Sequence, residues 1–114
     1  MREARCLSTV LGCFQHDFPS DWYRHCLTQR LPFLTQIRLA LGSIDACLRH
    51  AGANAGQVVK VTIFMTDISE RAAINPLRIE YFGENRPAST LVEVSQLVDP
   101  AFKVEIEVVA FVDA

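Results

Sequence analysis

The 114-residue sequence has no excess of positive charge, since 11 Lys and Arg stand against 13 Asp and Glu, for a formal net charge of −2. A surface that binds nucleic acid needs a basic field, so this balance argues against a nucleic-acid partner. The sequence also lacks an apolar run of roughly 18 residues, the length needed to cross a bilayer. We therefore expect neither a nucleic-acid-binding protein nor a membrane protein.

Metal-binding patterns are missing as well. The four cysteines form no Cys-x-x-Cys pair, and no histidine stands at zinc-finger spacing, so we expect no metal site. Cys47 lies in an apolar helical pattern and is interpreted as a small buried side chain. A nucleophilic pair of a cysteine with His16 or His25 stays open, because residue order fixes no geometry.

The N-terminal segment MREARCLSTVLGCF contains an acid and no clean apolar block, so it does not predict a signal peptide. Cysteines without a secretory signal are typical of reduced thiols in the cytoplasm. We therefore expect cytoplasmic localisation.

What the sequence does contain is typical of a globular chain: 50% of its residues are hydrophobic and 21% are charged. The length suits one domain, and no internal repeat or low-complexity tract divides it. We expect a single domain over residues 1–114.

A helix and a strand are predicted in the first half of the well-patterned region. Apolar residues recur at helical spacing over residues 35–51, and Gly52 follows where a left-handed cap favours glycine. Residues 58–66, VVKVTIFMT, are rich in β-branched side chains and apolar on both sides. This pattern predicts a strand inside the sheet.

A second helix is expected to begin after Asp67, because Asp67 and Glu70 match a capping box. Pro76 disrupts a helix interior, so we expect the helix to break there, with Asn75 as the N-cap of a second piece that ends at Gly83.

Two further strands, residues 88–94 and 103–112, complete an α+β pattern with helices on one side of a sheet. Residues 1–33 alternate poorly, and we expect a hairpin there with strands at 6–14 and 22–28.

The segments VVKVTIFMTD, IN, EYFGENRPAS and VEIEVVA, in this order, resemble the RidA/YjgF family over about residues 34–112. The resemblance makes residues 34–114 the matched core and residues 1–33 a divergent N-terminal hairpin. It implies a chorismate-mutase-like β-sheet backed by two helices on one face, assembled as a homotrimer with sites in the clefts between subunits.

The family resemblance also implies an activity. Active members hydrolyse reactive enamine and imine intermediates to 2-oxo acids and ammonia, with no metal and no organic cofactor. Members are also described as translation inhibitors or endoribonucleases. The acidic net charge and the lack of a stripe of basic and aromatic residues argue against ribonuclease activity here.

Glu105 matches the family's acidic residue that positions the attacking water. Glu105 and Glu107 lie two residues apart on one face of a strand, a spacing that suits acid–base chemistry but is more often that of a solvated sheet face. Asn75 matches a family asparagine, although a helix cap would explain it too. We take Glu105 as the catalytic candidate and Asn75 as a substrate-binding candidate.

The family's arginine for the substrate carboxylate belongs to a Pro-Ala-Arg pattern, and Ser89 stands in its place here. A serine lacks both the charge and the reach of that arginine. We take Arg86, Ser89 and Thr90 as further substrate-binding candidates; the alternative is that Arg86 is an ordinary turn residue and the other two are ordinary strand residues.

Two functions therefore stay open for a small-molecule ligand at an intersubunit cleft. The first is an enamine or imine deaminase. The second is a non-catalytic trimeric ligand-binding or regulatory protein that has lost the carboxylate-binding arginine.

Overall fold

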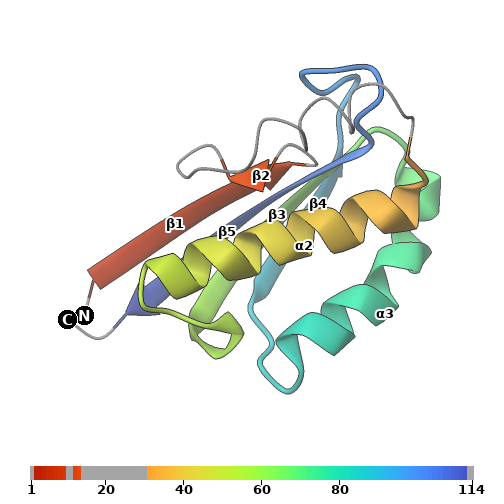
Figure 1. The fold of residues 1–114 in the computed structure, drawn as a ribbon. Helices are drawn as coiled ribbons and strands as arrows, with labels where there is room; N and C mark the ends of the chain where they lie inside the picture. Colours follow the sequence, from red (N-terminus) through yellow and green to blue (C-terminus); the bar gives the residue numbers. More distant parts are fainter. Residues whose placement is uncertain (1, 10–11, 14–30, 113–114) are drawn as a thin grey trace.

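The computed structural model describes the backbone of residues 2–9, 12–13 and 31–112, and side chains from residue 31 to 112. The sheet and its two helices account for most of these residues (Figure 1). The described elements are β1 (Arg2–Thr9), β2 (Gly12–Cys13), α2 (Phe33–His50), η1 (Ala55–Gln57), β3 (Val58–Met65), η2 (Ile68–Glu70), α3 (Arg71–Phe82), β4 (Ala88–Glu93) and β5 (Val104–Val112).

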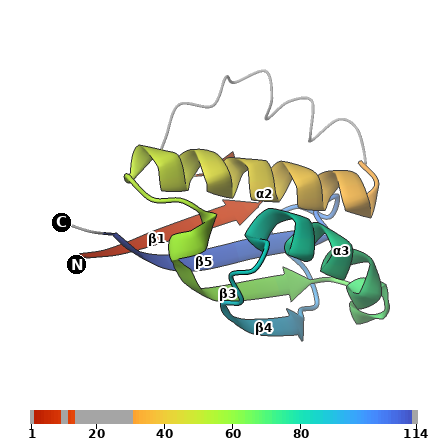
Figure 2. The ribbon, with the colours of Figure 1, turned by 90° about the horizontal axis from the view of Figure 1, so that it is seen from below.

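The strands form one sheet in the order β2-β1-β5-β3-β4. β3 and β4 run parallel, and the other neighbouring pairs are antiparallel. Parallel neighbours need a crossover connection, and α3 lies within the one that links β3 to β4. Both helices lie on the same side of the sheet (Figure 2), which confirms the expected α+β fold with two helices on one face.

The core lies between this side of the sheet and the helices. Ile37 and Ile44 of α2 are fully buried, as are Ile63 of β3 and Ile106 of β5, which pair in the β3–β5 ladder. Burying an aliphatic side chain of this size contributes about 1.5–3 kcal/mol, so the helical stripe and the alternating strands stabilise one another. The predicted bounds of α2, β3, β4 and β5 are confirmed within two residues.

A buried glutamine ties the start of α2 to the connection between β4 and β5. The Gln36 side-chain amide donates to the carbonyls of Leu31 and Ala101 at 3.0 and 2.9 Å, and its oxygen accepts from the Lys103 backbone at 2.8 Å. All three bonds reach backbone groups outside the helix, so Gln36 replaces the water that these groups would otherwise need.

The second helix differs from its prediction. α3 is continuous from Arg71 to Phe82 with Pro76 inside it, and Asp67 caps the preceding η2 turn through the Ser69 backbone. Pro76 and Ala72 are exposed, so water can bond the Ala72 carbonyl that the proline leaves without an N–H partner. Asn75 is therefore an interior helix residue and not an N-cap.

Both predicted glycine terminators are confirmed. Gly52 and Gly83 have φ angles of 81° and 59°, the only positive values in the described backbone. Non-glycine residues rarely adopt this conformation, so the two glycines end α2 and α3 where they do.

The N-terminal region is only partly described. The predicted single strand at residues 6–14 is wrong: β1 begins at Arg2 and ends at Thr9, and Gly12 and Cys13 form a separate strand, β2. The two strands pair antiparallel through Ser8 with Cys13 and Thr9 with Gly12. The predicted strand at residues 22–28 lies outside the described residues.

The cysteine prediction needs a correction at one position. Cys47 packs against the core, but it is half-buried and not fully buried as predicted. It is also disulfide-bonded, so the interpretation as a reduced thiol is wrong there. Within the described part of the chain, neither helix is long and apolar enough to cross a membrane. Cytoplasmic localisation stays a prediction.

Candidate functional site

A pocket of about 350 Å³ opens beside β4, the last strand of the sheet. Its walls are one side of α3, the loop of residues 83–87, the middle of β3 and the start of β4. The lining residues are Val61, Asn75, Arg78, Ile79, Phe82, Gly83, Asn85, Arg86, Pro87 and Ser89. The volume falls within the range for small-molecule sites.

Arg78 joins the polar residues of this pocket. Its Nη2 donates to Asn75 Oδ1 and its Nη1 to Ser89 Oγ, both at 2.6 Å. Asn75 and Arg78 meet because residues three apart share a helix face. Ser89 pairs with the buried Val61 in the β3–β4 ladder, which turns its side chain toward α3.

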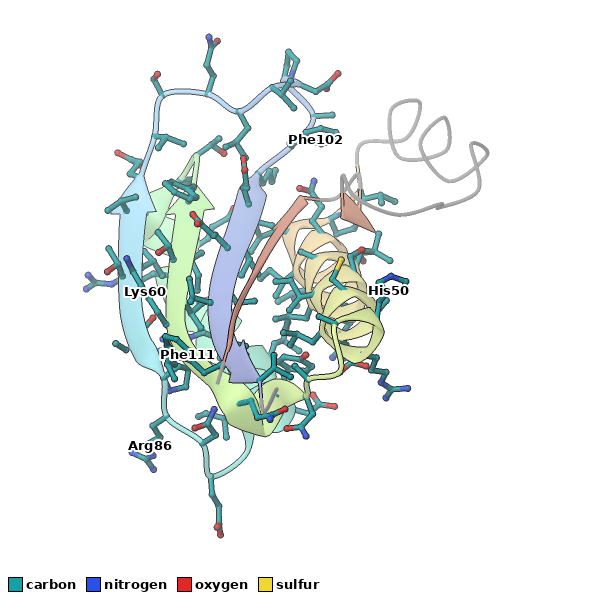
Figure 3. The ribbon with its side chains drawn as sticks, turned by 90° about the vertical axis from the view of Figure 1, so that its left-hand side faces the viewer. His50, Lys60, Arg86, Phe102 and Phe111 are labelled. Carbon is teal, nitrogen blue, oxygen red and sulfur yellow. The ribbon has the colours of Figure 1, made fainter. Side chains whose placement is uncertain are left out.

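Hydrogen bonds hold the loop of residues 83–87 at its start and at its middle. The Asn85 side-chain amide donates to the carbonyls of Ala55 and Val58 at 2.9 and 3.0 Å, which fixes the loop to the start of β3. The Gly83 N–H bonds the Ile79 carbonyl at 2.9 Å and closes the end of α3. These bonds fix the position of Arg86 at the pocket rim, where its exposed side chain points outward (Figure 3).

The pocket combines positive charge with apolar walls. Arg78 and Arg86 line it, none of the lining residues that the structure describes is acidic, and the other walls include Ile79, Phe82 and Pro87. Such a lining favours a small anion that carries an apolar group.

Thr90 and Glu105 lie on the other face of the sheet, the open face, made by Lys60, Thr62, Phe64, Thr90, Val92, Glu105, Glu107, Val109 and Phe111. The alternation along a strand puts Thr90 opposite to its neighbour Ser89. Lys60 and Phe111 project from the sheet away from α2, which carries His50 (Figure 3). Within one chain, the sheet therefore separates Glu105 from Asn75, Arg86 and Ser89.

Glu105 is half-buried on the open face. Burial raises the pKa of its carboxyl above the ordinary value, and the nearby charge of Glu107 raises this pKa further. A carboxyl with a raised pKa exchanges protons nearer to neutral pH, which suits a group that acts on water.

Sequence reasoning found three of the pocket residues but missed Arg78 and Asn85. The spacing Asn75-x-x-Arg78 was a usable signal, because it puts the two side chains on one helix face. The bonds of Asn85 to Ala55 and Val58 carried no such signal, since they cross about 30 residues of chain.

The described residues contain no group of three His, Cys, Asp or Glu side chains that could hold a metal ion. The polar side chains that line the pocket are those of Asn75, Arg78, Asn85, Arg86 and Ser89.

Comparisons with known proteins agree with this architecture. The family model described as Endoribonuclease L-PSP matches residues 19–112. A RutC family protein from Pyrococcus abyssi is 40% identical over 76 residues, which are 67% of this chain and 59% of that protein. The 2-iminobutanoate/2-iminopropanoate deaminase of Escherichia coli K12 is 35% identical over 78 residues, or 66% of this chain and 60% of that enzyme.

The fold is also similar to that of a solved structure of a YjgF/YER057c/UK114 family member from Mycobacterium tuberculosis. The two share 38% identity and a TM-score of 0.69, over 71% of this chain and 69% of that one. The chain spans about three fifths of the length of the curated relatives it matches.

Proposed function

Because the chain belongs to the RidA/YjgF family, we propose that it hydrolyses small enamine or imine acids to 2-oxo acids and ammonia. The activity named for the Escherichia coli relative supports this proposal. The observation that carries it is the pocket beside β4, where two arginines lie next to apolar walls and no acidic side chain is among the described lining residues. An imino acid has a matching carboxylate and side chain.

The proposed site lies between subunits of a homotrimer with the chorismate-mutase-like arrangement. The separation of Glu105 from the pocket by the sheet supports this, because one chain alone cannot bring the carboxyl to a ligand held beside Arg78 and Ser89. β4 is an edge strand, so the open face of a second copy can approach the pocket from that side.

The open face itself supports an assembly. Val92 and Phe111 on this face are 37% and 38% exposed, although apolar side chains of this size gain free energy from burial. A neighbouring copy would cover them and would further desolvate Glu105.

In the proposed reaction, Glu105 of one subunit orients a water molecule and accepts its proton as the oxygen bonds to the imine carbon. The C=N electron pair moves to nitrogen, which is protonated, and the resulting amino alcohol collapses to the carbonyl product and ammonia. The raised pKa of Glu105 favours both the uptake and the return of the proton.

The test is release of 2-oxo acid from imino acids generated freshly from several amino acids. We expect the purified chain to accelerate release over buffer, and Glu105→Ala to lower the rate by about 100-fold or more, the contribution typical of a positioned acid–base group. Equal rates with and without the protein, for every precursor, would show that the proposal is wrong.

The alternative is a trimeric ligand-binding or regulatory protein without turnover. The specific observation in its favour is Ser89, which stands where the family resemblance places the carboxylate-binding arginine. This alternative predicts saturable binding of a small carboxylate by a protein that releases no 2-oxo acid.

A further inference from the structure

The guanidinium of Arg78 contacts Ser89, the residue that stands where the family resemblance places an arginine. Its Nη1 lies 2.6 Å from Ser89 Oγ, although Arg78 belongs to α3 and Ser89 to β4. We propose that Arg78 is the carboxylate-binding residue of this protein and supplies from the helix the charge that position 89 lacks. The inference deepens the proposed function, on which its choice of ligand rests.

The hydrogen bonds of Arg78 hold the guanidinium in one orientation. Asn75 Oδ1 and Ser89 Oγ, each 2.6 Å away, take up one N–H from each terminal nitrogen. A guanidinium carries five N–H donors in a planar fork, so three are left for a ligand. Ser89 thus positions the cation, and its hydroxyl serves as an acceptor for it.

The charge of Arg78 lacks a counter-charge in the described structure. No carboxylate between residues 31 and 112 forms an ion pair with it, and its two partners are a neutral amide and a neutral hydroxyl. Arg78 is half-buried, so water screens its charge less than it screens the exposed Arg86 at the rim. An anion gains most from binding to a cation in this state.

The pocket also limits the size of the anion. Its volume is about 350 Å³, and Val61, Ile79 and Phe82 provide apolar walls. A carboxylate with a short aliphatic chain matches both properties: the carboxylate pairs with the Arg78 fork, and the chain lies against the walls.

The experiment is calorimetric titration of the full chain with 2-oxobutanoate, a stable carboxylate that needs no turnover. We expect Arg78→Gln to weaken binding by about 10- to 100-fold, the range for a lost charged hydrogen-bond pair. Arg78→Lys should retain part of the affinity, because it keeps the charge but loses the fork. The matched control is Arg71→Gln, an exposed arginine of the same helix outside the pocket, which should bind as the original protein does.

A relocation variant separates a binding role from a structural one. In Arg78→Ala/Ser89→Arg the charge moves to β4, and we expect it to recover most of the affinity that Arg78→Ala alone loses. A merely structural role for Arg78 would leave the double variant as weak as the single one.

The titrations also keep the two proposals apart. Binding that depends on Arg78, without release of 2-oxo acid, would contradict the deaminase proposal and support the inference about Arg78. Release that is unchanged in Arg78→Gln, equal affinity of Arg78→Gln and the original protein, or no binding of 2-oxobutanoate by the original protein would each overturn the inference.

Discussion

The two faces of the sheet differ in how far they are buried within a single chain. On the helix-covered face, Ile63, Ile106 and Val108 are fully buried, and no charged side chain is among the buried residues that the structure describes. The open face carries Glu105 and Glu107 among apolar side chains that stay partly exposed. The chain's own helices cover the first face, whereas no described helix covers the second, which we propose is covered by a neighbouring copy.

The candidate functional residues also lie on different sides of the sheet. The positive charge lies on the helix-covered side, where α3 packs beside β4, and the carboxyl of raised pKa lies on the open face. A reaction that uses both requires two copies, so assembly and activity are expected to be lost together.

The most severe change is a charge placed on the open face. We expect Val92→Lys to convert the proposed trimer to monomers, because burying an unpaired ammonium costs on the order of several kcal/mol per interface. Light scattering would show the mass fall from three chains to one. The matched control is Val98→Lys, since Val98 is 75% exposed in the connection between β4 and β5. Equal masses for both variants would argue against an interface on the open face.

Substitutions at two adjacent valines of β5 allow a direct comparison of how much each face contributes to the free energy of unfolding. Val108 is fully buried under the helices and Val109 lies half-buried on the open face. We expect Val108→Ala to lower the free energy of unfolding by about 2–3 kcal/mol through lost burial and a residual cavity. Val109→Ala should cost less than about 1 kcal/mol in dilute protein. Denaturant unfolding measures both, and equal losses would contradict the proposed contrast.

A substitution at one of the two carboxyls of the open face has the smallest expected effect. Glu107→Gln removes the like charge, so the pKa of Glu105 should fall toward its ordinary value but stay above it, because burial, the larger cause of the shift, remains. NMR titration of isotope-labelled glutamate carboxyls measures this shift. Any pH limit on activity that follows Glu105 ionisation should move to lower pH with it. An unchanged or higher pKa would contradict the assigned cause.

The sign of this shift also bears on stability. The folded chain holds the Glu105 proton more tightly than the unfolded chain, because its folded pKa is the higher one. The free energy that Glu105 contributes to folding is therefore greatest below the ordinary pKa and is lost as pH rises through the raised value. Glu107→Gln should flatten this dependence.

The success of sequence reasoning differs along the chain. The apolar stripe with Gly52 after it predicted α2, and Gly83 marked the end of α3, because these signals act over a few residues. The predicted break at Pro76 was wrong, since whether a proline interrupts a helix depends on whether its surroundings can solvate the freed carbonyl. Whether water reaches that carbonyl depends on how the helix packs in the tertiary structure.

The candidate site shows the same limit. Asn75, Arg86 and Ser89 were found from their pattern and do line one pocket, but the pattern grouped them with Glu105 and Thr90, which lie on the opposite face. Arg78 donates hydrogen bonds to both Asn75 and Ser89. It belongs to none of the segments on which the family resemblance rests.

The sequence by itself determined the α+β class and, within two residues, the bounds of α2, β3, β4 and β5, because periodicity and residue identity are local properties. Only the tertiary structure decided that Arg78 contacts Ser89 and that the sheet separates both from Glu105. Helix packing and strand register set these relations, and both depend on contacts between segments far apart in the chain.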